Sequence, residues 1–366
     1  MTSDLNRRGF LKSTAATGLA AALAPAIAHA ADEPLGIVLV LPSPLGDVGW
    51  GHALSAGLDP IKAALGDKAK ITVLENIPEG PDADRIMTKA VADGNKFLIA
   101  GSFGYQNGAM QVAKRNPDVS VLHASGFMTA PNFSPFAARY YQGTYLMGMA
   151  AAAVSKSGKI GSVSAFPIPE LITSVNAFAL GAQAINPKVE VSVVWVNSWF
   201  DPAKEQEAAK ALLAQGCDVI FSNAQDSPSV VSVCEEAGAY VFNLNSSMQK
   251  YAPKKYLGCV ATDWSPFFSQ QINDHIAGTF KGAVAFLGVA DKVVKVLDWS
   301  KDIPADVMTK ITEAEGKIAD GSLSVFAGPI AKQDGSEGVA AGASMDDAAI
   351  VAMDWHVKGV TTPLPK

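Results

Sequence analysis

The chain has 366 residues, of which 49% are hydrophobic and 17% charged, and its formal net charge at pH 7 is −6. This composition is typical of a globular protein, and the negative charge argues against a nucleic-acid-binding protein, which needs a basic surface. Beyond the first 30 residues no stretch is long and apolar enough to span a membrane, and the remaining length suits two domains.

The N-terminus has the pattern of an export signal. Arg7-Arg8-Gly9-Phe10-Leu11-Lys12 leads into an Ala-rich apolar stretch that ends at Ala28-His29-Ala30. Paired arginines before such a stretch are typical of a twin-arginine signal, and the small-x-small ending is where signal peptidase cuts. No Cys follows to carry a lipid. We therefore predict a signal peptide over residues 1–30, cleaved after Ala30, and a free periplasmic chain that does not insert into the membrane.

The rest of the chain alternates short apolar strands with helices. In the first half, strands are expected at 37–41, 71–74, 97–100 and 119–123, and helices at 53–65, 82–93 and 109–115. In the second half, strands are expected at 158–163, 189–196 and 218–221, and helices at 174–184 and 202–216. The tail adds a strand at 293–297, a helix at 302–318, a strand and turn at 322–330, an exposed loop at 335–342 and a short helix within 345–355.

The two halves repeat one another at an offset of about 121 residues, so that Pro81-Asp82-Ala83-Asp84 aligns with Pro202-Ala203-Lys204-Glu205. Alternating strands and helices are typical of parallel βαβ units with right-handed crossovers. We predict an α/β protein of two doubly wound, Rossmann-like lobes with parallel sheets joined by a hinge. Lobe 1 takes residues 32–137 and 262–292, and lobe 2 takes residues 138–261 and 293–366.

A doubly wound sheet binds its ligand beyond the carboxyl ends of its strands, so the residues that follow each strand are the candidates. They are Asp47, Trp50, Phe103, Trp199, Asn223, Asp226, Asn245 and Trp264. Trp50 and Trp199, from opposite lobes, are expected to enclose a flat ring. Asn223 and Asp226, helped by Asp47 and Asn245, are expected to bind the polar edge of that ring, with Phe103 and Trp264 completing the wall.

Several of these residues also have a structural interpretation. Trp50 would then only cover its own lobe, and Asp226 would cap the helix that begins near Pro228. Asn245 would hold the hinge turn, and Asp263, before Trp264, is as fitting for a helix cap as for a ligand contact.

The sequence offers few patterns that indicate catalysis or metal binding. The histidines after residue 30 have no metal-ligand spacing, and the chain has neither a nucleophile elbow nor a phosphate-binding glycine loop. We predict no catalytic residue, no metal and no cofactor. Cys217, Cys234 and Cys259 are expected to be buried thiols, although export leaves a disulfide between two of them open.

Four segments resemble the basic membrane protein (BMP) family of ABC-transporter solute-binding proteins, which has the type I periplasmic-binding fold. They are Gly46-Asp47-Val48-Gly49-Trp50, the run from Arg139-Tyr140-Tyr141 to Gly143-Thr144-Tyr145-Leu146-Met147-Gly148, Trp199-Phe200-Asp201-Pro202 and Gly216-Cys217-Asp218-Val219-Ile220. The resemblance covers about residues 35–330.

The resemblance implies a purine ligand, because the nucleoside receptors of this family hold the purine between aromatics and bind the ribose with acidic residues and a lysine. This chain departs at the ribose positions. It has Ala124-Ser125 where those receptors have an Asp, Asn245-Ser246-Ser247 where they have Asp-Ser-Asp, and Ala261-Thr262-Asp263-Trp264 where they supply the lysine. The departures favour a free nucleobase, adenine above all.

We therefore expect a monomeric periplasmic binding protein that captures a purine base and delivers it to the membrane permease of an ABC transporter. Two alternatives stay open at this point. One is an exported enzyme such as a nucleoside hydrolase, and the other is a subunit that presents its ligand to a sensory receptor. The sequence leaves open whether the lobes rest open or closed.

Overall fold

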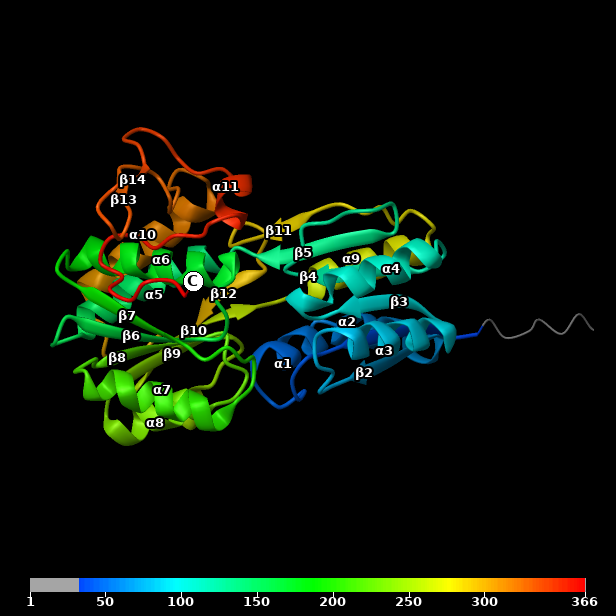
Figure 1. Cartoon of the computed structure of the whole chain (residues 1–366), viewed down its shortest axis with the longest axis horizontal. Coiled ribbons are helices and arrows are strands. Elements are labelled where there is room, and N and C mark those ends of the chain that lie inside the picture. The colour runs from blue at the N-terminus through cyan, green and yellow to red at the C-terminus, as the bar shows by residue number, and fades with distance from the viewer. Residues whose placement is uncertain (1–32, 366) are drawn as a thin grey trace, which may run out of the picture. The chain divides into compact units, whose positions relative to one another are not determined.

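A computed structural model describes residues 33–365 (Figure 1). The predicted signal peptide and its cleavage site after Ala30 lie outside these residues. Within the described part of the chain, no helix combines the length and the apolar character needed to cross a membrane.

Lobe 1 is built on a six-stranded sheet in the order β11-β5-β4-β3-β1-β2, and every strand pair in it is parallel. Its strands are β1 (Leu35–Val40), β2 (Ala69–Leu74), β3 (Asn95–Ala100), β4 (Ser120–Ala124), β5 (Phe133–Ala138) and β11 (Ala285–Leu287). Its helices are α1 (Gly49–Ala56), α2 (Asp59–Leu65), α3 (Pro81–Ala92), α4 (Gln106–Arg115) and α9 (Ser265–Ile276).

Lobe 2 repeats this plan with the strand order β12-β10-β9-β8-β6-β7, in which only β12 runs antiparallel to its neighbour. Its strands are β6 (Lys159–Ser164), β7 (Glu190–Trp195), β8 (Val219–Asn223), β9 (Tyr240–Asn245), β10 (Tyr256–Thr262) and β12 (Val294–Leu297). Its helices are α5 (Tyr140–Val154), α6 (Pro169–Ile185), α7 (Pro202–Ala214), α8 (Ser229–Ala237), α10 (Ala305–Ala319) and α11 (Asp347–Val351), and the short strands β13 (Ile330–Ala331) and β14 (Glu337–Val339) pair with each other.

Each lobe is a sheet between two helical layers. In lobe 2, α5 and α6 cover one face of the sheet, and α7 and α8 cover the other (Figure 1). Because both faces are covered, the central strands β4, β8 and β10 are buried along their whole length, as expected for parallel sheets. The predicted α/β class, with two lobes and mainly parallel sheets, is confirmed.

Glycines on two helices explain part of the motif that resembles the BMP family. A Cβ on Gly148 of α5 would lie 2.1 Å from the carbonyl oxygen of Phe178, and one on Gly181 of α6 would lie 1.9 Å from that of Tyr145. Only glycine permits so close an approach of the two helix backbones, so Gly148 serves the packing of α5 on α6.

The chain passes between the two sheets three times, from β5 to α5, from β10 to α9 and from β11 to β12. The lobe boundaries expected after residues 137, 261 and 292 stay predictions. The segments that cross are the connections about which the two lobes can hinge.

Three local expectations differ from the structure. The single helix expected at 53–65 is two helices, α1 and α2, and α1 begins at Gly49, so Trp50 lies in its first turn and not on a loop. Helix α6 begins at Pro169, because a proline suits the first turn of a helix. In the tail, residues 335–342 contain strand β14 instead of only a loop, whereas strand β13 within the expected strand and turn at 322–330 begins only at Ile330.

Candidate functional site

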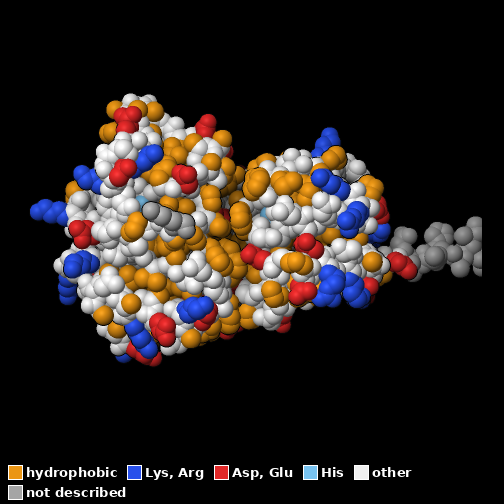
Figure 2. All heavy atoms as spheres, viewed as in Figure 1, with side chains coloured by type: hydrophobic (Ala, Val, Ile, Leu, Met, Phe, Trp, Pro, Cys, Tyr) orange, Lys and Arg blue, Asp and Glu red, His pale blue; other side chains and the backbone are white. Residues whose placement is uncertain are grey.

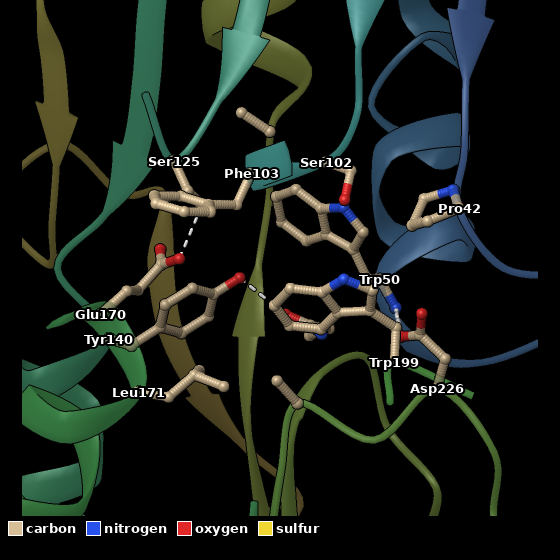
Figure 3. Close-up of a pocket in the computed structure, with 13 residues that line it drawn as sticks. Pro42, Trp50, Ser102, Phe103, Ser125, Tyr140, Glu170, Leu171, Trp199 and Asp226 are labelled. Carbon is tan, nitrogen blue, oxygen red and sulfur yellow. Dashed lines mark hydrogen bonds between the residues drawn. The ribbon is translucent and has the colours of Figure 1, made fainter. Parts of the chain in front are cut away.

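The carboxyl ends of the strands of both lobes surround a cavity of about 40 Å³ (Figure 3). Lobe 1 lines it with Pro42, Trp50, Ser102, Phe103, Ala124 and Ser125, and lobe 2 lines it with Tyr140, Glu170, Leu171, Trp199, Ala224, Asp226 and Asn245. Most of these residues lie at or just after the end of a strand. Small-molecule sites are commonly found where doubly wound sheets end.

Five of the eight residues selected from the sequence line this cavity: Trp50, Phe103, Trp199, Asp226 and Asn245. In Figure 3, Trp50 and Trp199 enter from one side of the cavity, and Phe103 and Tyr140 enter from the other. The structure therefore brings the two predicted indoles and two of the predicted polar side chains to one place.

Both indoles are held by hydrogen bonds. Trp50 Nε1 donates to the carbonyl oxygen of Gly101 at 2.8 Å, and its ring packs edge-on against Trp264 with centroids 5.9 Å apart. Trp199 Nε1 donates to Glu79 Oε1 of lobe 1 at 3.3 Å. The ring of Trp199 packs on Phe166, with centroids 4.7 Å apart. Trp50 thus has the more rigid support, because its partners are buried backbone and a buried ring.

Three selected residues lie outside the cavity wall. Asp47 is exposed and pairs with Lys250 and Tyr251 across the lobes. Asn223 is fully buried inside lobe 2 as the last residue of β8, where its Nδ2 donates to Ser164 Oγ at 3.1 Å. Trp264 is fully buried in lobe 1, so it supports Trp50 from behind and does not face the cavity.

Asp226 joins the two lobes. Its Oδ2 accepts a hydrogen bond from Ser43 Oγ at 2.5 Å, and its Oδ1 accepts one from the backbone N–H of Trp50 at 2.8 Å. That N–H belongs to the first turn of α1, which favours negative charge. Helix α8 has no side-chain cap, so the interpretation of Asp226 as its N-cap is wrong. Burial raises the pKa of Asp226 to about 6.

A second carboxyl, that of Glu170, also faces the cavity. Its Oε2 accepts a hydrogen bond from Ser125 Oγ of lobe 1 at 2.6 Å (Figure 3). Burial raises the pKa of Glu170 to about 7. Beside it, Tyr140 Oη donates to Asn245 Oδ1 at 2.6 Å, so the side chain of Asn245 is fixed in the wall.

Glu170, Tyr140 and Ser125 were missed as site residues, although the sequence carries a signal for each. Glu170 lies in the first turn of α6, the helix that follows strand β6, so the rule of reading strand ends would have selected it. Ser125 follows β4 directly, and Tyr140 lies in the motif that resembles the BMP family.

Three wall residues that are not glycine adopt left-handed backbone conformations: Ser125 with φ 57°, Ala224 with φ 60° and Asn245 with φ 77°. Such conformations are costly for residues with a Cβ and persist where the surrounding structure imposes them. Their concentration at three strand ends marks this cavity as a place where backbone geometry is constrained.

The lobes are closed on each other in this structure. Besides the bonds of Asp226 and Glu170, the backbone N–H of Gly49 donates to Ser246 Oγ at 2.7 Å. These bonds connect lobe 1 with lobe 2 around the cavity, and a hinge opening would break them.

The wall of the cavity holds two carboxyls and no Lys, Arg or His side chain. It is suited to an uncharged aromatic ring whose N–H groups donate to carboxyl and amide oxygens. Within residues 33–365 no three His, Cys, Asp or Glu side chains lie together as a metal site. Cys217, Cys234 and Cys259 are buried, as predicted, and none forms a disulfide.

Comparisons with known proteins agree with this architecture. Residues 35–327 match the family model of PnrA-like ABC transporter substrate-binding proteins, called Bmp. Residues 4–24 match the twin-arginine signal sequence, so the chain is exported to the periplasm. A solute-binding protein structure from Aeropyrum pernix superimposes with a TM-score of 0.71 at 18% identity, over 79% of this chain and 92% of that one. One from Conexibacter woesei gives 0.63 at 19%, over 79% and 97%.

Two curated relatives are similar over most of their length. A purine-binding protein of Brucella abortus is 40% identical over 93% of this chain and 96% of its own. A putative ABC transporter glucose-binding protein of Haloferax volcanii is 34% identical over 81% of this chain and 75% of its own. With the family match over most of its length and two type I lobes closed over one cavity, the chain belongs to the Bmp family of ABC transporter substrate-binding proteins.

Proposed function

We propose that this protein captures a purine nucleobase, with adenine as the favoured ligand, and delivers it to the permease of an ABC transporter. The observation that carries the proposal is the pair of indoles, Trp50 and Trp199, at a cavity that also holds Asp226, Glu170 and Asn245. The relative named a purine-binding protein supports the ligand class.

The purine is expected to bind along the indoles of Trp50 and Trp199, which offer flat apolar surfaces. A stacked aromatic contact contributes about 0.5–1.5 kcal/mol beyond the area that it buries. The edge of the ring would donate its N–H groups to Glu170 or Asp226, displacing the hydroxyls of Ser125 and Ser43 that occupy these oxygens now. Asn245, already held by Tyr140, would limit where the ring lies.

The wall favours a base over a nucleoside. Where the nucleoside receptors bind ribose with acidic residues, this chain has Ala124-Ser125 and Asn245-Ser246-Ser247, which carry no charge. The segment that supplies their lysine is Ala261-Thr262-Asp263-Trp264 in this chain and contains no lysine. A ribose has several hydroxyls, and each hydroxyl buried without a partner weakens binding.

Isothermal titration calorimetry of the chain from residue 31 tests the ligand class, with adenine, hypoxanthine, guanosine and glucose as ligands. Glucose is included because of the relative named as a glucose-binding protein. We expect tight binding of adenine, weaker binding of guanosine and no heat with glucose. If no purine binds, the ligand class is wrong, and if guanosine binds more tightly than the bases, the preference for a base is wrong.

Uptake experiments test the transport role. Cells that lack the protein are expected to lose high-affinity uptake of radiolabelled adenine, and uptake should return with the intact gene. Normal uptake without the protein, together with a lost response to the purine, would favour the sensory alternative. Conversion of a bound nucleoside into base and sugar would favour the hydrolase.

A further inference from the structure

A second hollow lies next to the cavity and opens to the surface between the lobes. It has a volume of about 290 Å³, and we call it the outer groove. Its wall in lobe 1 includes Phe127, Val284 and Phe286, and its wall in lobe 2 includes Ile168, Ile350 and Val351. In Figure 2, hydrophobic side chains gather along the junction of the two lobes.

The outer groove is unusually apolar for a surface. Six large hydrophobic residues stand out as exposed among residues 33–365, and three of them line this groove: Phe127 at 67%, Val284 at 63% and Val351 at 49%. A concentration of exposed apolar side chains in one hollow is typical of a binding surface rather than of ordinary solvent-facing structure.

The groove is continuous with the cavity. Phe103, Ser125 and Glu170 line both, so a single layer of side chains separates them. In that layer Ser125 Oγ donates a hydrogen bond to Glu170 Oε2 at 2.6 Å. A ligand N–H that replaces the Ser125 hydroxyl as donor to Glu170 would therefore point its substituent toward the outer groove.

The groove owes part of its wall to a segment beyond the family match, which ends at residue 327. Helix α11 brings Ile350 and Val351 there, and the helix is held in place. Asp346 accepts a hydrogen bond from the backbone N–H of Ala349, and Asp347 forms an ion pair with Arg139. Arg139 in turn lies over the ring of Phe286, 4.2 Å from its centroid. The wall is thus a fixed surface.

We propose that the protein binds purines whose exocyclic amine carries an apolar group, with the ring in the cavity and the apolar group in the outer groove. The placement of the ring rests on the proposed function. The amine N–H donates to Glu170, and an alkyl or aryl substituent of that nitrogen lies among Phe127, Val284 and Val351. Unsubstituted adenine uses the cavity alone and leaves the groove to solvent.

Calorimetry with N6-benzyladenine and adenine tests this proposal, using the chain from residue 31 and its double variant Val284→Asp/Val351→Asp. Both valines are exposed, so the substitutions spare the core. We expect the unaltered protein to bind N6-benzyladenine at least as tightly as adenine. The double variant should bind it about tenfold more weakly and bind adenine equally well, because burial of the benzyl group is lost.

The control is Ile276→Asp, which places one carboxylate, where the double variant places two, on an apolar residue of similar exposure outside the groove, and it should change neither affinity. Two results would show that the groove proposal is wrong while the purine function stands. In one, the unaltered protein binds N6-benzyladenine tenfold more weakly than adenine. In the other, the double variant binds N6-benzyladenine as tightly as the unaltered protein does.

If no purine binds, the purine function is wrong, and the groove is decided by titration with the apolar fluorophore N-phenyl-1-naphthylamine. A rise in fluorescence that the double variant abolishes and Ile276→Asp retains would keep the groove as an apolar binding site. Absence of that rise would overturn it.

Discussion

The two lobes share one strand order and differ in what they present to the cavity. Both carboxyls of the wall, Asp226 and Glu170, come from lobe 2. Lobe 1 meets them with uncharged donors, namely the hydroxyls of Ser43 and Ser125 and the backbone N–H of Trp50. The duplicated fold therefore supplies a common frame, and the strand-end residues have diverged into an acceptor side and a donor side. When the lobes close, the buried carboxyls of lobe 2 face uncharged groups of lobe 1. The stability of the closed form therefore depends on the geometry of a few hydrogen bonds.

The two indoles, one from each lobe, offer the sharpest test of this comparison. We expect Trp50→Ala to weaken adenine binding by about 100-fold or more, because it removes a stacking surface and the cover over buried Trp264. Trp199→Ala should weaken adenine binding by only about tenfold, because Trp199 is held by an exposed hydrogen bond to Glu79. Calorimetry measures both, and equal losses would contradict the difference in support.

A control separates loss of binding from loss of folding in this pair. Thermal unfolding without ligand should show Trp50→Ala only moderately destabilised, since Trp50 is half-buried. Trp50→Phe keeps an aromatic face and should recover most of the affinity. If Trp50→Phe binds as poorly as Trp50→Ala, stacking is not what Trp50 contributes.

The second test removes the buried acceptor of lobe 2. Asp226→Ala leaves the Ser43 hydroxyl and the Trp50 N–H without a partner when the lobes close. An unpaired buried donor costs about 1–3 kcal/mol, so we expect adenine affinity to fall about 30-fold. Asp218→Ala is the matched control. The carboxylate of Asp218 accepts hydrogen bonds from Ser155 Oγ and the backbone N–H of Lys156, both within lobe 2. Its loss should therefore lower the stability of the fold without the same loss of adenine affinity.

The third test uses pH. In the closed form the pKa of Asp226 is raised to about 6 and that of Glu170 to about 7, whereas both should have ordinary values when opening exposes them to water. Between about pH 4 and 7 the closed form therefore binds more protons. Raising the pH through this window disfavours closure, and above it the effect levels off.

We expect the ratio of closed to open unliganded protein to fall at least about tenfold from pH 5 to pH 8. Small-angle X-ray scattering follows it through the radius of gyration. Glu170→Gln should remove the part of this fall that occurs near pH 7, because it removes the carboxyl whose pKa is about 7 in the closed form. A closed fraction that rises with pH would contradict the assignment of these carboxyls to the closed form.

Most strands were predictable because they are short apolar runs between breaks, although β5 and β11 were not predicted. The strand-end rule then led to most of the wall. Trp50, Trp199 and Asp226 were found in this way. Trp264 and Asn223 were selected by the same rule and lie in the core. Sequence order gives the end of a strand but does not give the direction in which a side chain leaves it.

The pairing between lobes could not be predicted. Ser43 and Asp226 are 183 residues apart, and Ser125 and Glu170 are joined only when the lobes close. Each residue has an ordinary local interpretation, as a loop serine or a helix cap. Only the position of one sheet relative to the other gives them a shared role.

The smallest effect is expected at Asp47, which also joins the lobes but outside the cavity. Its ion pair with Lys250 lies in water, where such pairs contribute little because solvent and salt screen them. Asp47→Ala should change adenine affinity by less than about threefold, and the small change should vanish at high salt. Calorimetry at low and high ionic strength measures this, with Lys250→Ala as the partner variant. A loss comparable to that of Asp226→Ala would mean that exposed charge, and not the buried hydrogen bonds of the acceptor side, holds the lobes together.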